Sequence, residues 1–183
     1  MSSRNKNLFR LILSAMFLAM ALFLPFLTGQ NQQFGKMLCL MHIPVLLCGF
    51  VCGPWYGLCV GLAAPLMRSI IFGMPHMMPT AVAMAFELLT YGCAAGLLYR
   101  AFPKKIWRVY PALVLSMLAG RFVWGIAMTA LTGLGQNEGG FGWAIFWTNG
   151  FATALPGIAL QIVLIPAVVM ALEKAFPAFM KQK

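Results

Sequence analysis

Six apolar stretches, each close to the length of a membrane-crossing helix, follow one another along the chain with short connections between them. A helix needs about 20 predominantly apolar residues to cross the hydrocarbon core of a bilayer. We therefore expect membrane spans at residues 8–27, 37–53, 55–71, 80–99, 110–131 and 145–172. These spans use most of the 183 residues. The sequence thus predicts an all-α integral membrane protein, a compact bundle of six transmembrane helices forming a single transmembrane domain over residues 1–183.

The basic residues are grouped beside these stretches. Most of the 13 Lys and Arg fall into three groups: Arg4, Lys6 and Arg10; Arg100, Lys104, Lys105 and Arg108; Lys174, Lys181 and Lys183. Six spans place both termini on one side of the membrane, together with the connection that holds the second group. Because basic residues concentrate in cytoplasmic segments, the pattern predicts an N-in/C-in orientation. A nucleic-acid binder carries its charge on a solvated face instead, so no nucleic-acid partner is expected.

Three charged residues, Arg68, Glu87 and Arg121, lie inside predicted spans. A charge at the bilayer centre costs on the order of 3 kcal/mol, and it persists where it faces a partner or a polar cavity. At about 1.5 Å per helical residue, Glu87 lies roughly 10 Å below the outer surface, while Arg68 and Arg121 lie roughly 20 Å and 16 Å above the inner one. His42 and Asn149 also lie in the outer half, so five different spans each contribute one residue.

Glu87 could pair with Arg68 or Arg121 as a structural ion pair, but one carboxylate does not neutralise two guanidinium groups. The remaining positive charge needs water or an anion, and a guanidinium suits a carboxylate or a phosphate. We therefore expect an outward-opening cavity for a small anionic or strongly polar ligand. Trp143 is either an interfacial aromatic residue or part of the roof of this cavity. His76, in the loop MPHMMP, is either a solvated residue or a ligand contact.

Small residues recur at helical spacing in the middle of the chain. They are Gly49, Gly53, Gly57 and Gly61, followed by Gly92 and Gly96. Such spacing lets helix backbones approach closely in a membrane, so we expect tight helix contacts there. Cys39 and His42 have a conceivable metal-ligand spacing, but no second pair completes a site. Neither a metal nor a cofactor is expected.

The sequence has no evident means of driving transport by itself. It contains no phosphate-binding motif G-x-x-x-x-G-K-[ST], no Asp, and only one carboxylate within the predicted spans. It also lacks a nucleophile–base or paired-carboxylate arrangement for hydrolysis. A binding protein of this kind implies a partner that supplies energy.

The segment MHIPVLLCGFVCGPWYGLCVGLAAPLMRS, followed by FGMPHMMPTAVAMAFELLTYG, resembles the substrate-binding S components of energy-coupling factor (ECF) vitamin transporters, in the group with pantothenate, pyridoxine, folate and cobalamin members. The resemblance implies a six-helix bundle in a prokaryotic plasma membrane, with an outward-facing ligand pocket. It also implies docking onto a transmembrane coupling subunit with two ATPase subunits. Ala15 and Ala19 match the small-residue pattern of the first helix that this docking uses. The loop MPHMMP departs from the plainer proline-rich loop that the family suggests.

These observations lead to a vitamin-capturing subunit, without enzymatic activity of its own, that binds its ligand through His42, Arg68, Glu87, Arg121 and Asn149. Pantothenate is the first candidate, because a net positive pocket suits a carboxylate, and pyridoxine-type compounds are the second. Two other classes remain open at this point. One is a self-sufficient carrier or channel, and the other is a small intramembrane enzyme with Glu87 and His42 as acid and base.

Overall fold

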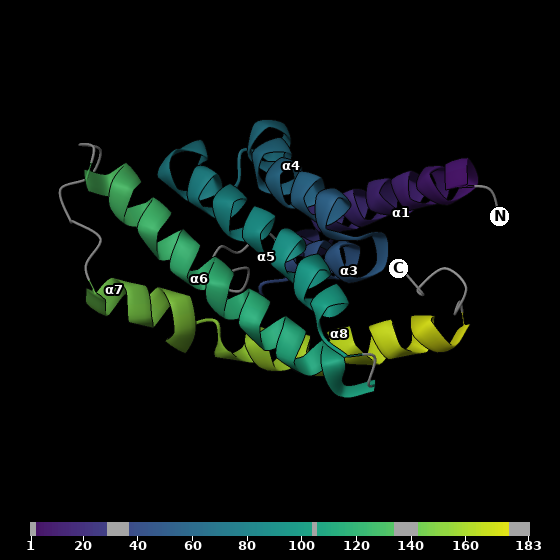
Figure 1. Ribbon diagram of the computed structural model, residues 1–183. Helices are drawn as coiled ribbons and strands as arrows, with labels where there is room; N and C mark the ends of the chain where they lie inside the picture. Colours follow the sequence, from purple (N-terminus) through teal and green to yellow (C-terminus); the bar gives the residue numbers. More distant parts are fainter. Residues whose placement is uncertain (1–2, 29–36, 104–105, 134–142, 176–183) are drawn as a thin grey trace.

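The computed structural model describes residues 3–28, 37–103, 106–133 and 143–175. Within these ranges every regular element is helical, and the helices pack side by side (Figure 1). In chain order the elements are α1 (Ser3–Phe23), η1 (Leu24–Thr28), α3 (His42–Cys52), α4 (Pro54–Phe72), η2 (Met77–Ala81), α5 (Val82–Ala101), η3 (Ile106–Arg108), α6 (Val109–Gly133), α7 (Trp143–Trp147), η4 (Thr148–Ala152) and α8 (Leu155–Ala175). The expected all-α fold class is therefore found throughout the described part of the chain.

Five of the described helical segments are long and apolar enough to cross a membrane. They are Asn5–Leu27, Pro54–Phe72, Met77–Ala101, Val109–Gly133 and Gly150–Ala175. Their outward faces carry large apolar side chains: Ile126 of α6 is 70 % exposed and Val163 of α8 is 72 % exposed. Side chains of this kind are stable against lipid and costly against water. The chain is accordingly a multi-pass membrane protein.

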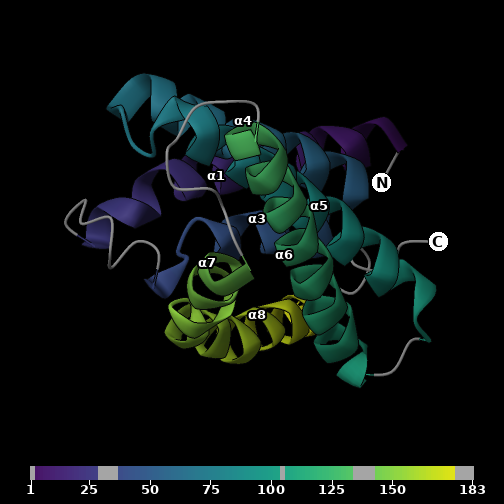
Figure 2. The same ribbon diagram turned by 90° about the vertical axis from the view of Figure 1, so that its left-hand side faces the viewer.

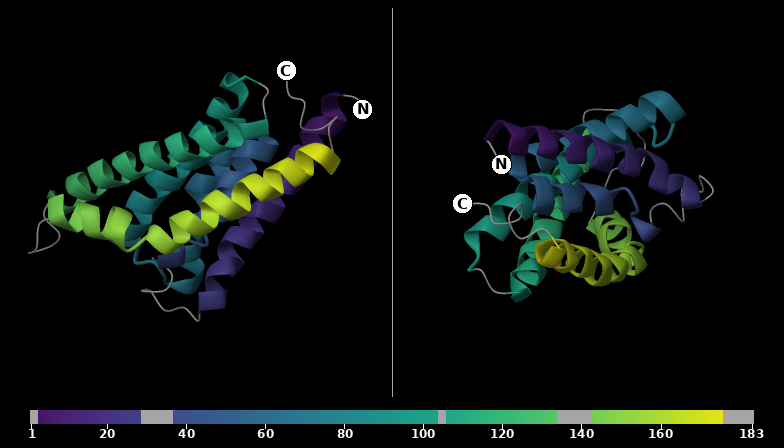
Figure 3. Two further views of the ribbon diagram at one scale, coloured as in Figure 1. Left: turned by 90° about the horizontal axis from the view of Figure 1, so that it is seen from below. Right: turned by 90° about the vertical axis from the view of Figure 1, so that its right-hand side faces the viewer.

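The helix α3 lies in the interior of the bundle, between α1 and α8 (Figures 2 and 3), and all of its 11 residues are buried. At about 1.5 Å per residue it is roughly 16 Å long, about half the thickness of the hydrocarbon core. We expected one continuous span over residues 37–53. The structure differs, because the chain turns at Cys39, whose φ of 47° is left-handed, and helix resumes only at His42. Pro44 lies in the first turn of α3, a position that proline favours because its missing N–H is not needed there.

A seam of glycines joins α3, α4 and α5. A Cβ atom built on Gly57 of α4 would lie 2.6 Å from the carbonyl oxygen of Gly92 on α5 and 2.8 Å from the Cα of Gly49 on α3. Gly61 and Gly96 are equally close to the backbone of a neighbouring helix. The predicted close helix contacts are confirmed, and they hold α5 rigidly against its neighbours.

The last expected span, residues 145–172, is interrupted in the structure. It consists of the short α7, the π-helical segment η4 and then α8. Pro156 is the second residue of α8, so it marks the start of a helix rather than a bend within one. The change of direction between α7 and α8 is visible in Figure 1.

The start of α1, the connection between α5 and α6 and the end of α8 lie toward one end of the bundle (Figures 1 and 3). Arg108 and Tyr99 both donate hydrogen bonds to Glu173, which ties η3 and α5 to the end of α8. The Arg108 guanidinium also lies 4.0 Å from the centre of the Tyr99 ring. These contacts of Glu173 thus join α5, η3 and α8 at this end of the bundle.

Candidate functional site

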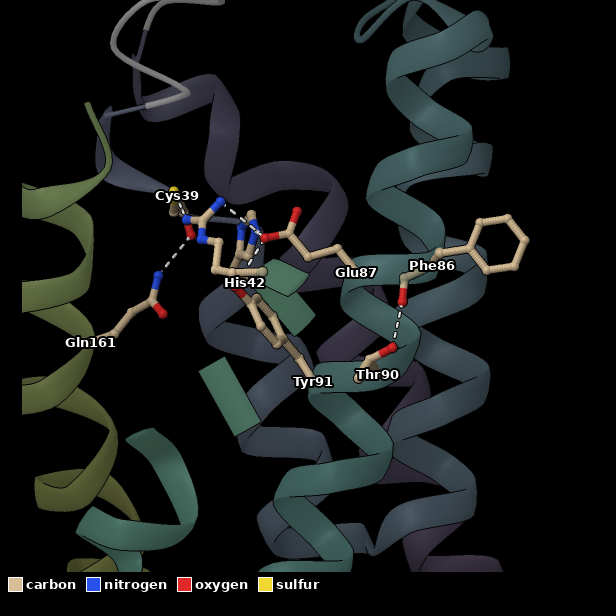
Figure 4. Close-up of polar contacts among 8 residues, drawn as sticks. Cys39, His42, Phe86, Glu87, Thr90, Tyr91 and Gln161 are labelled. Atoms are coloured by element: carbon tan, nitrogen blue, oxygen red, sulfur yellow. Dashed lines mark hydrogen bonds and ion pairs between the residues drawn. The ribbon is translucent and has the colours of Figure 1, made fainter. Parts of the chain in front are cut away.

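The carboxylate of Glu87 is the centre of a buried polar cluster. Glu87 lies one turn into α5 and is 1 % exposed. Its Oε1 atom lies 3.0 Å from Nη1 of Arg121 on α6 and accepts a hydrogen bond of 2.9 Å from the hydroxyl of Tyr91. Nε2 of His42, the first residue of α3, lies 3.6 Å from the same oxygen. Figure 4 shows Glu87, Tyr91 and His42 close together.

Helix geometry explains why these side chains meet. Glu87 and Tyr91 are four residues apart on α5, so they lie on one face of the helix. That face packs against α3 and α6. Gly120, next to Arg121 on α6, leaves room for the Tyr91 ring, because a Cβ atom there would overlap the ring. The Tyr91 and His42 rings then pack with their centres 5.4 Å apart.

The turn at Cys39 adds backbone groups to the cluster. The Cys39 carbonyl accepts hydrogen bonds from the His42 backbone N–H at 3.0 Å and from Nε2 of Gln161 on α8 at 3.4 Å. Its Sγ atom accepts one from Nη2 of Arg121 at 3.6 Å. Non-helical backbone at membrane depth is tolerated only where protein groups or a polar cavity satisfy it. Here Gln161 of α8 and the His42 backbone N–H bond to the carbonyl at the turn, and Arg121 of α6 bonds to the neighbouring sulfur.

We refer to these six residues as the Glu87 cluster: Cys39, His42, Glu87, Tyr91, Arg121 and Gln161. Several of their buried polar atoms have no hydrogen-bond partner among the described residues, namely Nδ1 and Nε2 of His42, Nε of Arg121 and Oε1 of Gln161. A buried polar group left without a partner costs about 1–3 kcal/mol. The cluster therefore has unused capacity both to donate and to accept hydrogen bonds.

Arg68 does not join this cluster. Although it is only 5 % exposed, its Nη1 donates a 2.6 Å hydrogen bond to the carbonyl of Leu22, in the last turn of α1. Its guanidinium carbon lies 5.0 Å from the centre of the Phe26 ring and 5.6 Å from that of Phe72. A cation is favourable at a helix C-terminus, where carbonyl groups are left without partners. The structure thus gives Arg68 a capping role and does not bring it to Glu87.

The other residues predicted for ligand binding lie away from the cluster or outside the description. His76 is exposed and immediately precedes η2. The side chains of Trp143, in α7, and Asn149, in η4, lie outside the described part of the structure. Ala15 and Ala19 are both exposed on α1. The roles of these residues remain predictions.

Sequence reasoning missed three members of the cluster. Tyr91 could have been found, because it stands four residues after the buried Glu87 and so shares its helix face. Gln161 is a lone amide in the apolar run GIALQIVLIP, and a polar residue at that depth is a site signal in a membrane helix. Cys39 had no comparable signal, because its contribution is a backbone turn rather than a side-chain chemistry.

Comparison with known proteins supplies the family context. The family model described as the substrate-specific component of ECF transporters matches residues 9–169. A search of the curated proteins found no match. The matched range includes all six residues of the Glu87 cluster.

Proposed function

The chain belongs to the substrate-specific components of ECF transporters, and on that basis we propose that it captures a water-soluble vitamin or vitamin precursor from outside the cell and delivers it with an ATP-driven coupling module. Members of this family are substrate-binding subunits of a transporter rather than enzymes. The proposal adds the kind of ligand, the side of capture and the residues that bind it.

One observation carries the assignment of the binding site: unused hydrogen-bonding atoms of His42, Arg121 and Gln161 belong to one buried cluster. These side chains come from α3, α6 and α8, and the Glu87 carboxylate comes from α5. A site that draws its polar groups from four helices can enclose a small molecule on several sides. It also sits where the backbone of the second predicted span is broken, which is where transporters commonly place their ligands.

The proposed partners are a transmembrane coupling subunit and two ATPase subunits. The sequence holds no nucleotide-binding motif of its own, so ATP hydrolysis is assigned to the partners. Ala15 and Ala19 are exposed on α1, where small side chains permit close approach of another helix. We place the protein in a prokaryotic plasma membrane, with the basic end of the bundle in the cytoplasm.

Pantothenate and pyridoxine-type compounds are the two candidate ligands. Pantothenate offers a carboxylate to Arg121 together with hydroxyl and amide groups, and pyridoxine offers hydroxyl groups on a heteroaromatic ring. The first test is mass spectrometry of small molecules that co-purify with the protein from detergent. The second is uptake of the identified compound by cells, with and without the coupling module.

The expected result is one tightly bound vitamin-like compound and uptake that requires the coupling module and ATP. Uptake into liposomes by this chain alone would favour a self-sufficient carrier instead. Chemical conversion of the compound by the purified chain would favour the enzyme. Either result would refute the proposed function.

A further inference from the structure

We infer that the Glu87 cluster selects a ligand that is uncharged at the point of contact and that both accepts and donates hydrogen bonds. This inference rests on the proposed function and deepens it by naming the class of ligand. It starts from the charges that the structure places in the cluster, and then uses the hydrogen-bonding atoms that those charges leave unused.

The cluster is electrically balanced. Glu87 and Arg121 are both buried and lie 3.0 Å apart. A buried ion pair of one carboxylate and one guanidinium carries no net charge. Arg68, which could have supplied an additional positive charge, donates to the Leu22 carbonyl at the end of α1. The described side chains of the cluster therefore leave no net charge to attract an anion when His42 is neutral.

The unused atoms include both hydrogen-bond donors and acceptors. Nε–H of Arg121 is a donor and Oε1 of Gln161 is an acceptor, and neither has a partner among the described residues. Nε2 of His42 faces Glu87 at 3.6 Å, which is beyond hydrogen-bonding distance. A neutral imidazole offers one N–H and one acceptor nitrogen, so His42 can serve either need. A ligand that satisfies this set must carry an acceptor for Arg121 and a donor for Gln161.

A carboxylate matches this set poorly. It has acceptors only, so it would leave Oε1 of Gln161 without a donor. It would also compete with Glu87 for the single guanidinium of Arg121, and two carboxylates sharing one site repel each other. Amides, ureides and hydroxylated neutral heteroaromatic rings carry both kinds of group. Pantothenate carries amide and hydroxyl groups that fit this set, but its carboxylate does not. This places pyridoxine-type compounds before pantothenate.

The test compares ligand pairs that differ in charge at one position. Pantothenate is paired with panthenol, in which an alcohol replaces the carboxylate, and 4-pyridoxate is paired with pyridoxine. Binding to the purified full-length protein is measured by calorimetry. We expect the uncharged member of at least one pair to bind about tenfold more tightly or better. Equal or tighter binding of the charged members overturns the inference.

Charge variants make the result specific to this cluster. Glu87→Gln leaves Arg121 without its counter-charge, so the preference should shift toward the charged member of each pair by about tenfold or more. The double variant Glu87→Gln/Arg121→Gln restores neutrality and should restore the wild-type preference. Thr90→Val is the matched control, because its hydroxyl bonds to the Phe86 carbonyl of its own helix and points away from the cluster (Figure 4). An unchanged preference in folded Glu87→Gln overturns the inference.

Failure of this inference can be distinguished from failure of the proposed function. Tight binding of charged ligands, together with uptake that depends on the coupling module, would support the proposed function and refute only the inference that the ligand is uncharged. If Glu87→Gln does not fold, the inference is tested by whether the wild-type protein prefers the uncharged or the charged member of each pair. If neither ligand pair binds, the charge of the co-purified ligand tests the inference. A neutral ligand supports it, and an anionic ligand overturns it. Absence of any ligand and of coupled uptake removes both proposals.

Discussion

Replacing Gly57 by alanine tests whether the glycine seam holds the bundle together. The new Cβ would lie 2.6 Å from the Gly92 carbonyl oxygen and 2.8 Å from the Gly49 Cα, whereas ordinary contacts begin at 3.4 Å. Both neighbours are backbone atoms, so no side-chain rotation can relieve the overlap. The helices α4 and α5 must therefore separate by about 0.8 Å, the difference between the first distance and an ordinary contact.

Two opposing effects set the size of the change. Overpacking of this kind costs about 1–3 kcal/mol, and the upper end applies because two backbones are in the way. Alanine also favours helix over glycine by about 1 kcal/mol. The net loss is then about 2 kcal/mol. For a chain of this size each kcal/mol lowers the melting temperature by about 2–4 °C, so we expect a fall of about 4–8 °C.

The assay is thermal unfolding in detergent, followed by circular dichroism. Gly133→Ala is the control, because a Cβ on Gly133, at the end of α6, meets nothing within 4 Å. This variant should keep the wild-type melting temperature or raise it by no more than about 4 °C, since its intrinsic effect is a gain below 1 kcal/mol. A melting temperature of Gly57→Ala equal to or above that of the wild type would refute the reasoning, because it would mean that helix propensity outweighs the backbone overlap.

Three further predictions concern the charged groups and the exposed face of α1. Arg121→Ala should weaken binding of the co-purified ligand by at least about tenfold, because it removes a ligand donor and leaves Glu87 buried without its partner; unchanged affinity in calorimetry would contradict the site. Arg68→Gln should cost about 1–2 kcal/mol of stability through the lost cap and ring contacts, while ligand affinity stays within about threefold; a larger loss of affinity would return Arg68 to the binding site. Ala15→Trp should abolish coupled uptake and leave ligand binding intact; surviving uptake would show that the partner docks elsewhere.

The elements of the bundle were largely predictable because membrane helices carry strong sequence signals. Apolar length and proline or glycine punctuation indicated where most of the helices lie, although the last predicted span is divided between α7, η4 and α8. The glycine spacing located the closest helix contacts. A pairing of Glu87 with one of the two arginines was also foreseeable, because a charge inside a membrane needs a partner. These features depend on local sequence and on the cost of burying charge, and both can be judged without coordinates.

The rest depended on which helix faces meet. Arg68 and Arg121 were indistinguishable as partners of Glu87, because their depths are similar and only the packing of α4 against α1 turns Arg68 toward the Leu22 carbonyl. The break at Cys39 was unpredictable for a related reason. A left-handed residue inside an apolar run costs free energy locally, and here Arg121 and Gln161, far along the chain, bond to it.

This long-range dependence links the fold of the cluster to ligand binding. The carbonyl and sulfur atoms of Cys39 hold Gln161 of α8 and Arg121 of α6 in place, and Arg121 in turn neutralises Glu87 of α5. Gln161 uses its nitrogen on the Cys39 carbonyl, while Arg121 uses Nη2 on the Cys39 sulfur and Nη1 on Glu87. Oε1 of the amide and Nε of the guanidinium remain unused. Because these unused atoms are already held in fixed positions, a ligand that meets them does not have to immobilise flexible side chains. We therefore expect the left-handed backbone at Cys39 to favour ligand binding although it is strained. A substitution that makes the second span a continuous helix should weaken ligand binding, even if it stabilises the helix.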